Sequence, residues 1–267
     1  MKDITAIQEK RRAAEREKYE TCYAALLEEM EKSLHAQNGI AAIGHASYFV
    51  RLGDLRVAVD PCSWLTPKDG EEALLKLLST ADAVIYTHAH SDHYSGELAE
   101  KLSKHIPIFL HEAVPYRGAN AVVIRAGEEK TVKDVTISFF ESDHDHGAGH
   151  TPECGFALRY LGKHYVFPAD VRGYLTPHAT FPHTALLVAH LWLGLGVADD
   201  LDACATDGFC RFVSDFHAER VLVGHLCDYR RDTPFFWSEA QYELVKNKLG
   251  DSRPIVFGDF VALACYP

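Results

Sequence analysis

The sequence predicts an α/β (α+β) fold in which helices cover the outer faces of two sheets, with a helical extension at the N-terminus. Three observations carry this prediction. The first 37 residues lack glycine and proline and repeat apolar side chains at helical spacing. Strand-type segments come first in pairs, and further along the chain they alternate with helical segments. Such an order is typical of two sheets packed between helices.

The composition narrows the class of protein. The chain has 267 residues and a net charge of −11, whereas proteins that bind phosphate backbones usually have a basic surface. We therefore expect no nucleic-acid partner. The seven cysteines show no CxxC spacing, the N-terminus has no apolar leader, and no apolar run reaches the ~20 residues that span a bilayer. These features predict a cytoplasmic protein with no membrane partner.

Residues 1–38 are predicted to form the helical extension, and residues 39–267 the main domain. Asn38-Gly39 is a typical end for a helix. The extension carries an apolar stripe of Tyr19, Tyr23, Leu26, Met30 and Leu34. This stripe must be covered, either by the body of the same chain or by a second copy in a homo-oligomer.

The main domain begins with a hairpin and continues as alternating elements. Ile40–Leu52 and Leu55–Asp60 are predicted strands joined by a turn at Gly53-Asp54. Further strands are expected over Ala83–Tyr86, Ile108–Leu110, Val132–Phe140, Phe156–Leu161, His164–Phe167, Ala185–Leu191, Arg220–Val223 and Pro254–Cys265. Helices are expected over Glu71–Leu78, Glu97–Lys104, Gly208–Phe216 and Phe236–Leu249.

The strongest chemical signal is a run of histidines directly after a buried strand. Sixteen histidines are present, and His88, His90, Asp92 and His93 stand within six residues that follow Ala83–Tyr86. Imidazoles and carboxylates are the ligands that Zn²⁺ takes. One short loop cannot place all four side chains around one ion. His88 and His90 can reach one metal, while Asp92 and His93 turn towards a second.

Further ligands must come from other strand ends. Each of three predicted strands is followed by histidine or aspartate: His144 after Val132–Phe140, Asp170 after His164–Phe167, and His225 after Arg220–Val223. Loops at strand ends present side chains from a rigid scaffold.

This ordered set resembles the metallo-β-lactamase superfamily of metallohydrolases, over about residues 40–267. The resemblance implies a four-layer αββα sandwich with two metal ions at one edge between the sheets. It further implies that His88, His90 and His144 hold the first metal, that Asp92, His93 and His225 hold the second, and that Asp170 bridges them. His146 is an alternative to His144. The family usually has glycine before the bridging aspartate, whereas Ala169 stands here.

A narrower resemblance concerns two short segments. Ile43-Gly44-His45-Ala46-Ser47, followed by an aspartate and a proline at 60 and 61, is similar to the ascorbate-6-phosphate lactonase branch. A small ester, a lactone such as a sugar-phosphate lactone, or a phosphodiester is then the expected substrate. In the first strand, His45 is expected to form a structural hydrogen bond.

The implied mechanism uses two divalent ions, Zn²⁺ or Mn²⁺, that lower the pKa of a shared water to about 7. Asp92 would orient the resulting nucleophile. Arg172, His190 and Tyr229 are candidates for contact with a small, anionic substrate. Arg172 could equally form a surface salt bridge. His190 could equally be a core residue or contact a metal ligand.

Two other functions fit the same scaffold: a single-iron thiol dioxygenase and a non-enzymatic binding protein. The flavin-linked di-iron branch is disfavoured, because it has glutamate where this chain has His90. The complete set of ligands argues against the binding protein, because a site that has lost its catalytic activity usually loses ligands as well.

Overall fold

The computed structural model describes residues 2–63, 66–67, 70–142, 144, 151–171, 174, 179–191, 204–226, 239–250, 253–258 and 260–264. Within these residues the chain forms five helices and two sheets of seven strands each. None of these helices has a stretch long and apolar enough to cross a membrane.

The first sheet has the strand order β14-β1-β2-β3-β4-β5-β6. Strands β1, β2 and β3 form an antiparallel meander, and the strands from β3 to β6 run parallel. The helices α2 (Glu71–Leu78) and α3 (Gly96–Leu102) belong to the crossovers between parallel strands. The strands are β1 (Gly39–Gly44), β2 (Ser47–Leu52), β3 (Leu55–Val59), β4 (Ala83–Tyr86), β5 (Ile108–His111), β6 (Ala121–Ile124) and β14 (Phe260–Ala264).

The second sheet has the order β13-β12-β11-β10-β9-β8-β7. It is antiparallel from β7 to β10 and parallel from β10 to β13. Helix α4 (Cys204–Asp215) lies between β11 and β12 in the chain, and α5 (Glu239–Leu249) between β12 and β13. The strands are β7 (Glu129–Val132), β8 (Val135–Ser142), β9 (Glu153–Tyr160), β10 (Lys163–Phe167), β11 (Thr184–His190), β12 (Val221–Gly224) and β13 (Ile255–Phe257).

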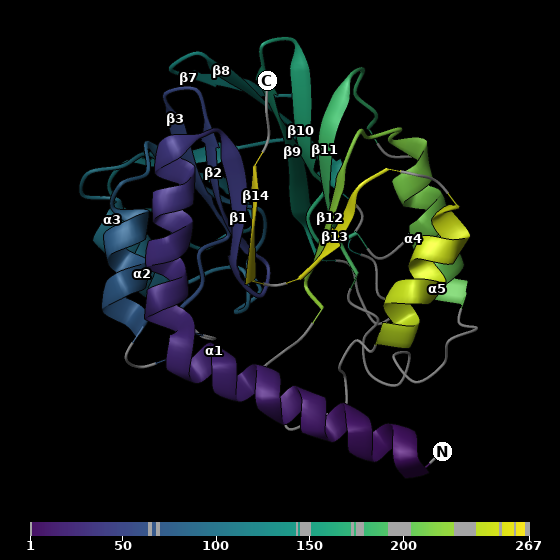
Figure 1. Cartoon of the computed structure of the whole chain (residues 1–267). Coiled ribbons are helices and arrows are strands. Elements are labelled where there is room, and N and C mark those ends of the chain that lie inside the picture. Colours follow the sequence, from purple (N-terminus) through teal and green to yellow (C-terminus); the bar gives the residue numbers. More distant parts are fainter. Residues whose placement is uncertain are drawn as a thin grey trace.

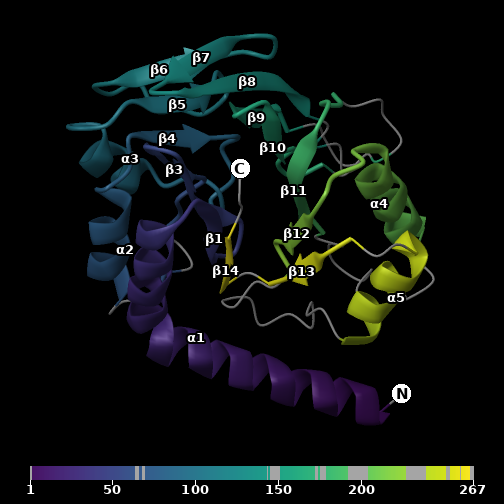
Figure 2. The ribbon, with the colours of Figure 1, turned by 45° about the horizontal axis from the view of Figure 1, so that its top comes forward.

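The two sheets pack face to face between two layers of helices, which confirms the predicted sandwich (Figure 1). Side chains of both inner faces, such as Val50 and Phe156, form a continuous core. Helices α1, α2 and α3 cover the outer face of the first sheet, and α4 and α5 cover that of the second (Figure 2). Each sheet is therefore buried on both faces over most of its area. Polar side chains that could contact a ligand are then expected at the strand ends.

The N-terminal extension is a single helix, α1 (Lys2–Ala36), whose second half packs on the first sheet. The buried stripe is Tyr19, Tyr23, Leu27, Met30 and Leu34, so Leu27 takes the place predicted for Leu26. It lies against α2, β1 and β14 of the same chain. The stripe therefore needs no second copy to cover it, and the homo-oligomer stays a prediction.

Two predicted strands are divided in the structure. Ile40–Leu52 forms β1 and β2, because Gly44 (φ 121°) and His45 (φ 53°) turn the chain between them. Pro254–Cys265 was predicted as one strand, which is wrong: β13 pairs with β12 in the second sheet, and β14 pairs with β1 in the first. This final segment joins the two sheets at one side of the sandwich. Strands β6 and β7 were not predicted: β7 (EKTV) has no apolar run, and β6 is an apolar run of four residues, AVVI, that was not assigned as a strand.

Candidate metal centre

The predicted ligands gather at one edge of the sandwich because they follow strands that end there. His88 comes two residues after β4, and His144 two residues after β8. Asp170 follows β10, and His225 directly follows β12. The carboxyl ends of the parallel strands in both sheets meet at this edge, where loops can bring together side chains distant in sequence.

His88, His90 and His144 form the first ligand group. Their ring centroids lie 4.7 Å (His88–His90), 4.8 Å (His90–His144) and 5.0 Å (His88–His144) apart. One nitrogen of each ring lies within 4.8 Å of the others, which is close enough for one ion to contact all three. His88 and His144 are fully buried. The alternative ligand His146 lies outside the described residues.

In two rings of this group, His88 and His144, a hydrogen bond engages Nδ1. His88 Nδ1 lies 3.0 Å from Thr87 Oγ1, and His144 Nδ1 lies 3.1 Å from Glu153 Oε2. The Nε2 atom of His88 is buried and has no hydrogen-bond partner within the described part of the chain. An unpartnered buried nitrogen is costly unless something binds it, so this group fits a metal ion.

Asp92, His93, His225 and Asp170 form the second group. His93 Nε2 and His225 Nε2 lie 3.2 Å and 3.3 Å from the same oxygen, Asp170 Oδ2. His225 Nε2 is also 3.6 Å from Asp92 Oδ2. Two imidazoles and two carboxylates therefore converge with Asp170 at their centre, and this donor set is one that zinc and manganese accept.

Two further residues support the second group. Asp60 Oδ2 accepts from His93 Nδ1 at 2.9 Å and from the Thr87 hydroxyl at 2.7 Å, which leaves His93 Nε2 directed at Asp170. His45 Nε2 lies 3.2 Å from Asp92 Oδ2, so the hydrogen bond expected for His45 is made to a predicted ligand. Carboxylates that hold a ligating histidine in one tautomer are common around metal sites.

Strained backbone also concentrates at this edge. His45, Asp60, Ala169 and His225 have φ of 53°, 44°, 66° and 59°. Non-glycine residues rarely adopt this left-handed conformation, and it persists where the surroundings dictate it, often at functional sites. The φ of Ala169 explains why glycine is usual before the bridging aspartate.

The two groups differ in their electrostatics. Burial, reinforced by the nearby His93, lowers the pKa of His88 well below its usual value, and burial also lowers the pKa of His90. Burial opposes the charged form of His93 and His225, but the Asp170 carboxylate outweighs it. It raises the pKa of His93 well above the usual value and the pKa of His225 to about 9. Without metal, His88 and His90 of the first group are therefore neutral, whereas His93 and His225 of the second group form ion pairs with Asp170.

The carboxylates of the second group stay ionised. Burial favours the protonated form of Asp170, but the charges of His225 and His93 hold its pKa well below its usual value. For Asp92, hydrogen bonds from His225 and His45 likewise outweigh burial and lower the pKa. Two anionic oxygen donors are therefore available at neutral pH.

Glu153 is a central residue that the sequence did not single out. It is fully buried at the start of β9, and its Oε2 accepts from His144 Nδ1 and, at 3.3 Å, from the backbone nitrogen of Asp170. Oε1 accepts from Ser142 at 2.6 Å. Burial raises the pKa of Glu153. The available signal was a glutamate entering a strand, but the strand was expected to begin only at Phe156.

Of the three predicted substrate contacts, His190 is the one within the described residues; Arg172 and Tyr229 lie outside them. His190 is buried at the end of β11, where its Nδ1 lies 2.7 Å from Asp170 Oδ1. Its Nε2 lies 2.9 Å from the Tyr48 hydroxyl. Both ring nitrogens of His190 are thus engaged by protein groups. Of the alternatives for His190, this favours a contact to the predicted ligand Asp170 over a contact to substrate.

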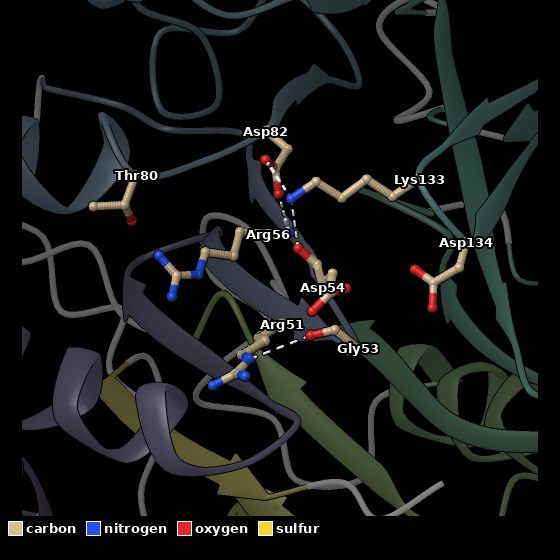
Figure 3. A pocket seen from close by; sticks show the side chains of 8 residues that line it. All are labelled: Arg51, Gly53, Asp54, Arg56, Thr80, Asp82, Lys133 and Asp134. Atoms are coloured by element: carbon tan, nitrogen blue, oxygen red, sulfur yellow. Dashed lines mark hydrogen bonds and ion pairs between the residues drawn. The ribbon is translucent and has the colours of Figure 1, made fainter.

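A separate cavity of approximately 610 Å³ lies at the opposite end of the sandwich (Figure 3). It is formed by the β2–β3 turn, the β7–β8 turn and residues that precede β4. Its lining residues are Arg51, Gly53, Asp54, Arg56, Thr80, Asp82, Lys133 and Asp134. Lys133 Nζ lies 2.7 Å from Asp82 Oδ1, and Arg51 Nη1 donates to the carbonyl of Leu34 at 2.7 Å.

Comparison with known proteins identifies the family of this chain. Residues 39–179 match the family model of the beta-lactamase superfamily domain. A metal-dependent hydrolase of Roseobacter denitrificans is 27% identical over 136 residues, which cover 46% of this chain. The match spans 58% of the length of that relative.

Solved structures share the fold at low sequence identity. Igni18, a metallo hydrolase of the archaeon Ignicoccus hospitalis, superposes with a TM-score of 0.62 at 15% identity, covering 86% of this chain and 98% of its own. An isothiocyanate hydrolase from Delia radicum gut bacteria gives a TM-score of 0.60 at 14% identity, covering 85% and 98%. These likenesses concern the arrangement of the two sheets and their helices.

Proposed function

This chain belongs to the beta-lactamase superfamily, and from that premise we propose that it is a metal-dependent hydrolase whose two ligand groups hold a pair of divalent ions. The observation that carries the proposal is the meeting of the two groups around Asp170. His88, His90 and His144 would hold the first ion. Asp92, His93 and His225 would hold the second, with Asp170 shared between them.

Two such ions, Zn²⁺ or Mn²⁺, would supply a water with a pKa of about 7 and would polarise the oxygen of the substrate. The protein contributes position and charge. Asp92 is ionised and only partly buried, with 17% of its side chain exposed, so it can accept a hydrogen bond from a water at the open side of the site. We assign it the orientation of the nucleophile.

The substrate class we propose is a small ester, a lactone such as a sugar-phosphate lactone, or a phosphodiester. The hydrolase names of the relatives support hydrolysis in general. The segment around His45 resembles the ascorbate-6-phosphate lactonase branch, and this resemblance is what favours the lactone. His45 itself contacts Asp92. Arg172, next but one to Asp170 in the sequence, would favour an anionic substrate.

The test begins with metal analysis of the full chain purified without chelator, followed by hydrolysis assays on aryl esters, lactones, sugar-phosphate lactones and bis-aryl phosphodiesters. We expect about two ions per chain and turnover of at least one class. His90→Ala should abolish that turnover, whereas His105→Ala, at an exposed position in the turn after α3, should not. Iron as the resident metal, with oxygen uptake on thiols and no hydrolysis, would instead identify a thiol dioxygenase. A chain that binds no metal would contradict the proposal.

A further inference from the structure

Tyr48 and His190 meet across the sandwich directly behind Asp170. Tyr48 comes from β2 of the first sheet, and His190 is the last residue of β11 in the second. Their rings are stacked, with centroids 5.7 Å apart and an interplanar angle of 20°. Tyr48 has no exposed surface and His190 has 7%. The contact therefore joins the two sheets at the level of the candidate metal centre.

Each ring nitrogen of His190 has one partner. Asp170 Oδ1 can only accept, so the His190 nitrogen 2.7 Å away, Nδ1, carries the proton. The Tyr48 hydroxyl lies 2.9 Å from the other ring nitrogen, Nε2. Tyr48 thereby holds the imidazole in the orientation that directs the Nδ1–H group at Asp170.

These hydrogen bonds give the two oxygens of Asp170 different partners. Oδ1 is held by His190, whereas Oδ2 faces the Nε2 atoms of His93 and His225. Only Oδ2 is therefore directed at the second ligand group. Without the bond at Oδ1, the carboxylate could rotate about its terminal bond and offer either oxygen.

The neighbouring strand leaves room for the Tyr48 hydroxyl. A Cβ atom on Gly224 would lie 2.2 Å from the Tyr48 hydroxyl oxygen, a distance that no side chain tolerates. Gly224 directly precedes the ligand His225. Phenylalanine would fill the apolar core without needing that space, so packing alone does not explain the hydroxyl group. Its hydrogen bond to His190 does.

We propose that Tyr48 and His190 are positioning residues that orient the carboxylate of Asp170 for metal binding, with Tyr48 acting through His190. The proposal rests on the proposed function, since it gives Asp170 its role at the metal centre. It also assigns His190 to the protein side of the site rather than to the substrate.

The first experiment compares metal binding by the full-length parent and by Tyr48→Phe, which removes only the hydroxyl group. Zn²⁺ and Co²⁺ would be titrated calorimetrically into metal-stripped protein, and the visible spectrum of the Co²⁺ form recorded. Loss of such an indirect contact weakens metal binding roughly 10–100-fold, and we expect a loss in that range with a changed Co²⁺ spectrum. Tyr116→Phe is the matched control, because this buried hydroxyl bonds Ser103 in the outer helix layer.

The second experiment tests whether Tyr48 acts through His190. His190→Asn keeps an N–H donor near the position of Nδ1 and should retain more metal affinity than His190→Leu. Adding Tyr48→Phe to His190→Leu should cause no further loss, because residues acting in one chain are not additive. Two results would overturn the proposal. One is a metal affinity of Tyr48→Phe equal to that of the parent. The other is an equal loss of affinity when Tyr48→Phe is introduced into the parent and into His190→Leu. Thermal melts would confirm that each variant is folded.

A third measurement separates this proposal from the proposed function. Nitrogen NMR of the metal-free chain should show a proton on Nδ1 of His190 in the parent and a smaller share of that form in Tyr48→Phe. A parent in which Nδ1 carries no proton would overturn the proposal whether or not the chain hydrolyses anything. A parent that binds metal but cleaves no substrate would contradict the proposed function and leave the orientation of Asp170 unaffected.

Discussion

Both ends of the sandwich gather charged side chains, but they use them differently. One end, called the metal end below, carries the candidate metal centre. There the carboxylates of Asp60, Glu153 and Asp170 are buried and directed at histidines. At the opposite end, the cavity of Figure 3 is lined by half-buried or exposed charges that interact with one another. Charge density alone therefore does not distinguish the two ends.

The partners of these charges do distinguish the ends. At the opposite end, Lys133 pairs with Asp82, and Arg51 donates to carbonyls at the C-terminus of α1, where a cation is favourable. These contacts attach the long helix and the turns to the first sheet. At the metal end, the buried Nε2 of His88 lacks a hydrogen-bond partner among the described residues. Donor atoms left over after the protein's own hydrogen bonds indicate where a ligand belongs.

The largest effect is expected from Asp170→Asn. The amide keeps the shape of the carboxylate but loses its charge, so the shared ligand between the two groups is lost. A metal contributes several kcal/mol of transition-state stabilisation, and we expect turnover to fall on the order of 10³-fold or more. Steady-state kinetics and metal content would be measured together. Unchanged kinetics would remove Asp170 from the ligand set.

Metal removal should act on stability at the same end. An ion present at 100 times its Kd stabilises the folded state by about 2.7 kcal/mol, which corresponds to roughly 5–10 °C in a chain of this size. Calorimetry with and without chelator should show a shift of that order. The shift should be equally large in Lys133→Ala. A parent whose Tm is insensitive to chelator would show that no ion contributes to folding stability.

Glu153→Gln should give the next effect. The amide loses the negative charge beside His144 and the backbone nitrogen of Asp170, and its NH2 group cannot accept the bond that Ser142 donates to Oε1. Loss of a supporting contact lowers metal affinity roughly 10–100-fold, with turnover falling accordingly. Metal titration of stripped protein is the measurement. Glu129→Gln, whose carboxylate bonds Ser138 on β8 at the surface, is the control and should bind metal as the parent does.

The sequence predicted the centre of the fold better than its rim. Glu71–Leu78 and Ala83–Tyr86 were predicted to the residue, because amphipathic spacing and a buried run define them without tertiary context. The single strand predicted at Pro254–Cys265 was wrong, because only tertiary pairing assigns its two halves to different sheets. The partly exposed strand β7 follows from its pairing with β8 rather than from an apolar pattern, whereas β6 is a short apolar run that the sequence did offer.

The same division applies to the candidate site. Candidate ligands next to one another, such as those from His88 to His93, are visible as a motif. Glu153 and Tyr48 are not, because each looks like an ordinary strand residue until the fold brings it to a histidine from another strand or loop. Support for a metal site is a property of three-dimensional contacts that short motifs do not encode.

A smaller change at the metal end is expected from Ala169→Gly. Alanine in the left-handed region costs about 1–2 kcal/mol, while glycine loses about 0.5–1 kcal/mol more conformational entropy on folding. We therefore expect stability to change by about 0–1.5 kcal/mol in favour of glycine, with metal content unchanged. Chemical denaturation would measure it. A destabilised glycine variant would show that neighbouring contacts of the methyl group outweigh the backbone strain.

The smallest effect is expected from Lys133→Ala at the opposite end. The Lys133–Asp82 pair is partly exposed, with 42% and 26% of the two side chains accessible, so solvent screens it. Pairs of this kind contribute about 0–1 kcal/mol, and the free energy of unfolding should fall within that range. Metal affinity and turnover should equal those of the parent, because the pair lies beyond the opposite ends of the strands that carry the ligands. A loss of metal affinity in Lys133→Ala would show that the two ends are coupled through the sheets, and the contrast between them would then fail.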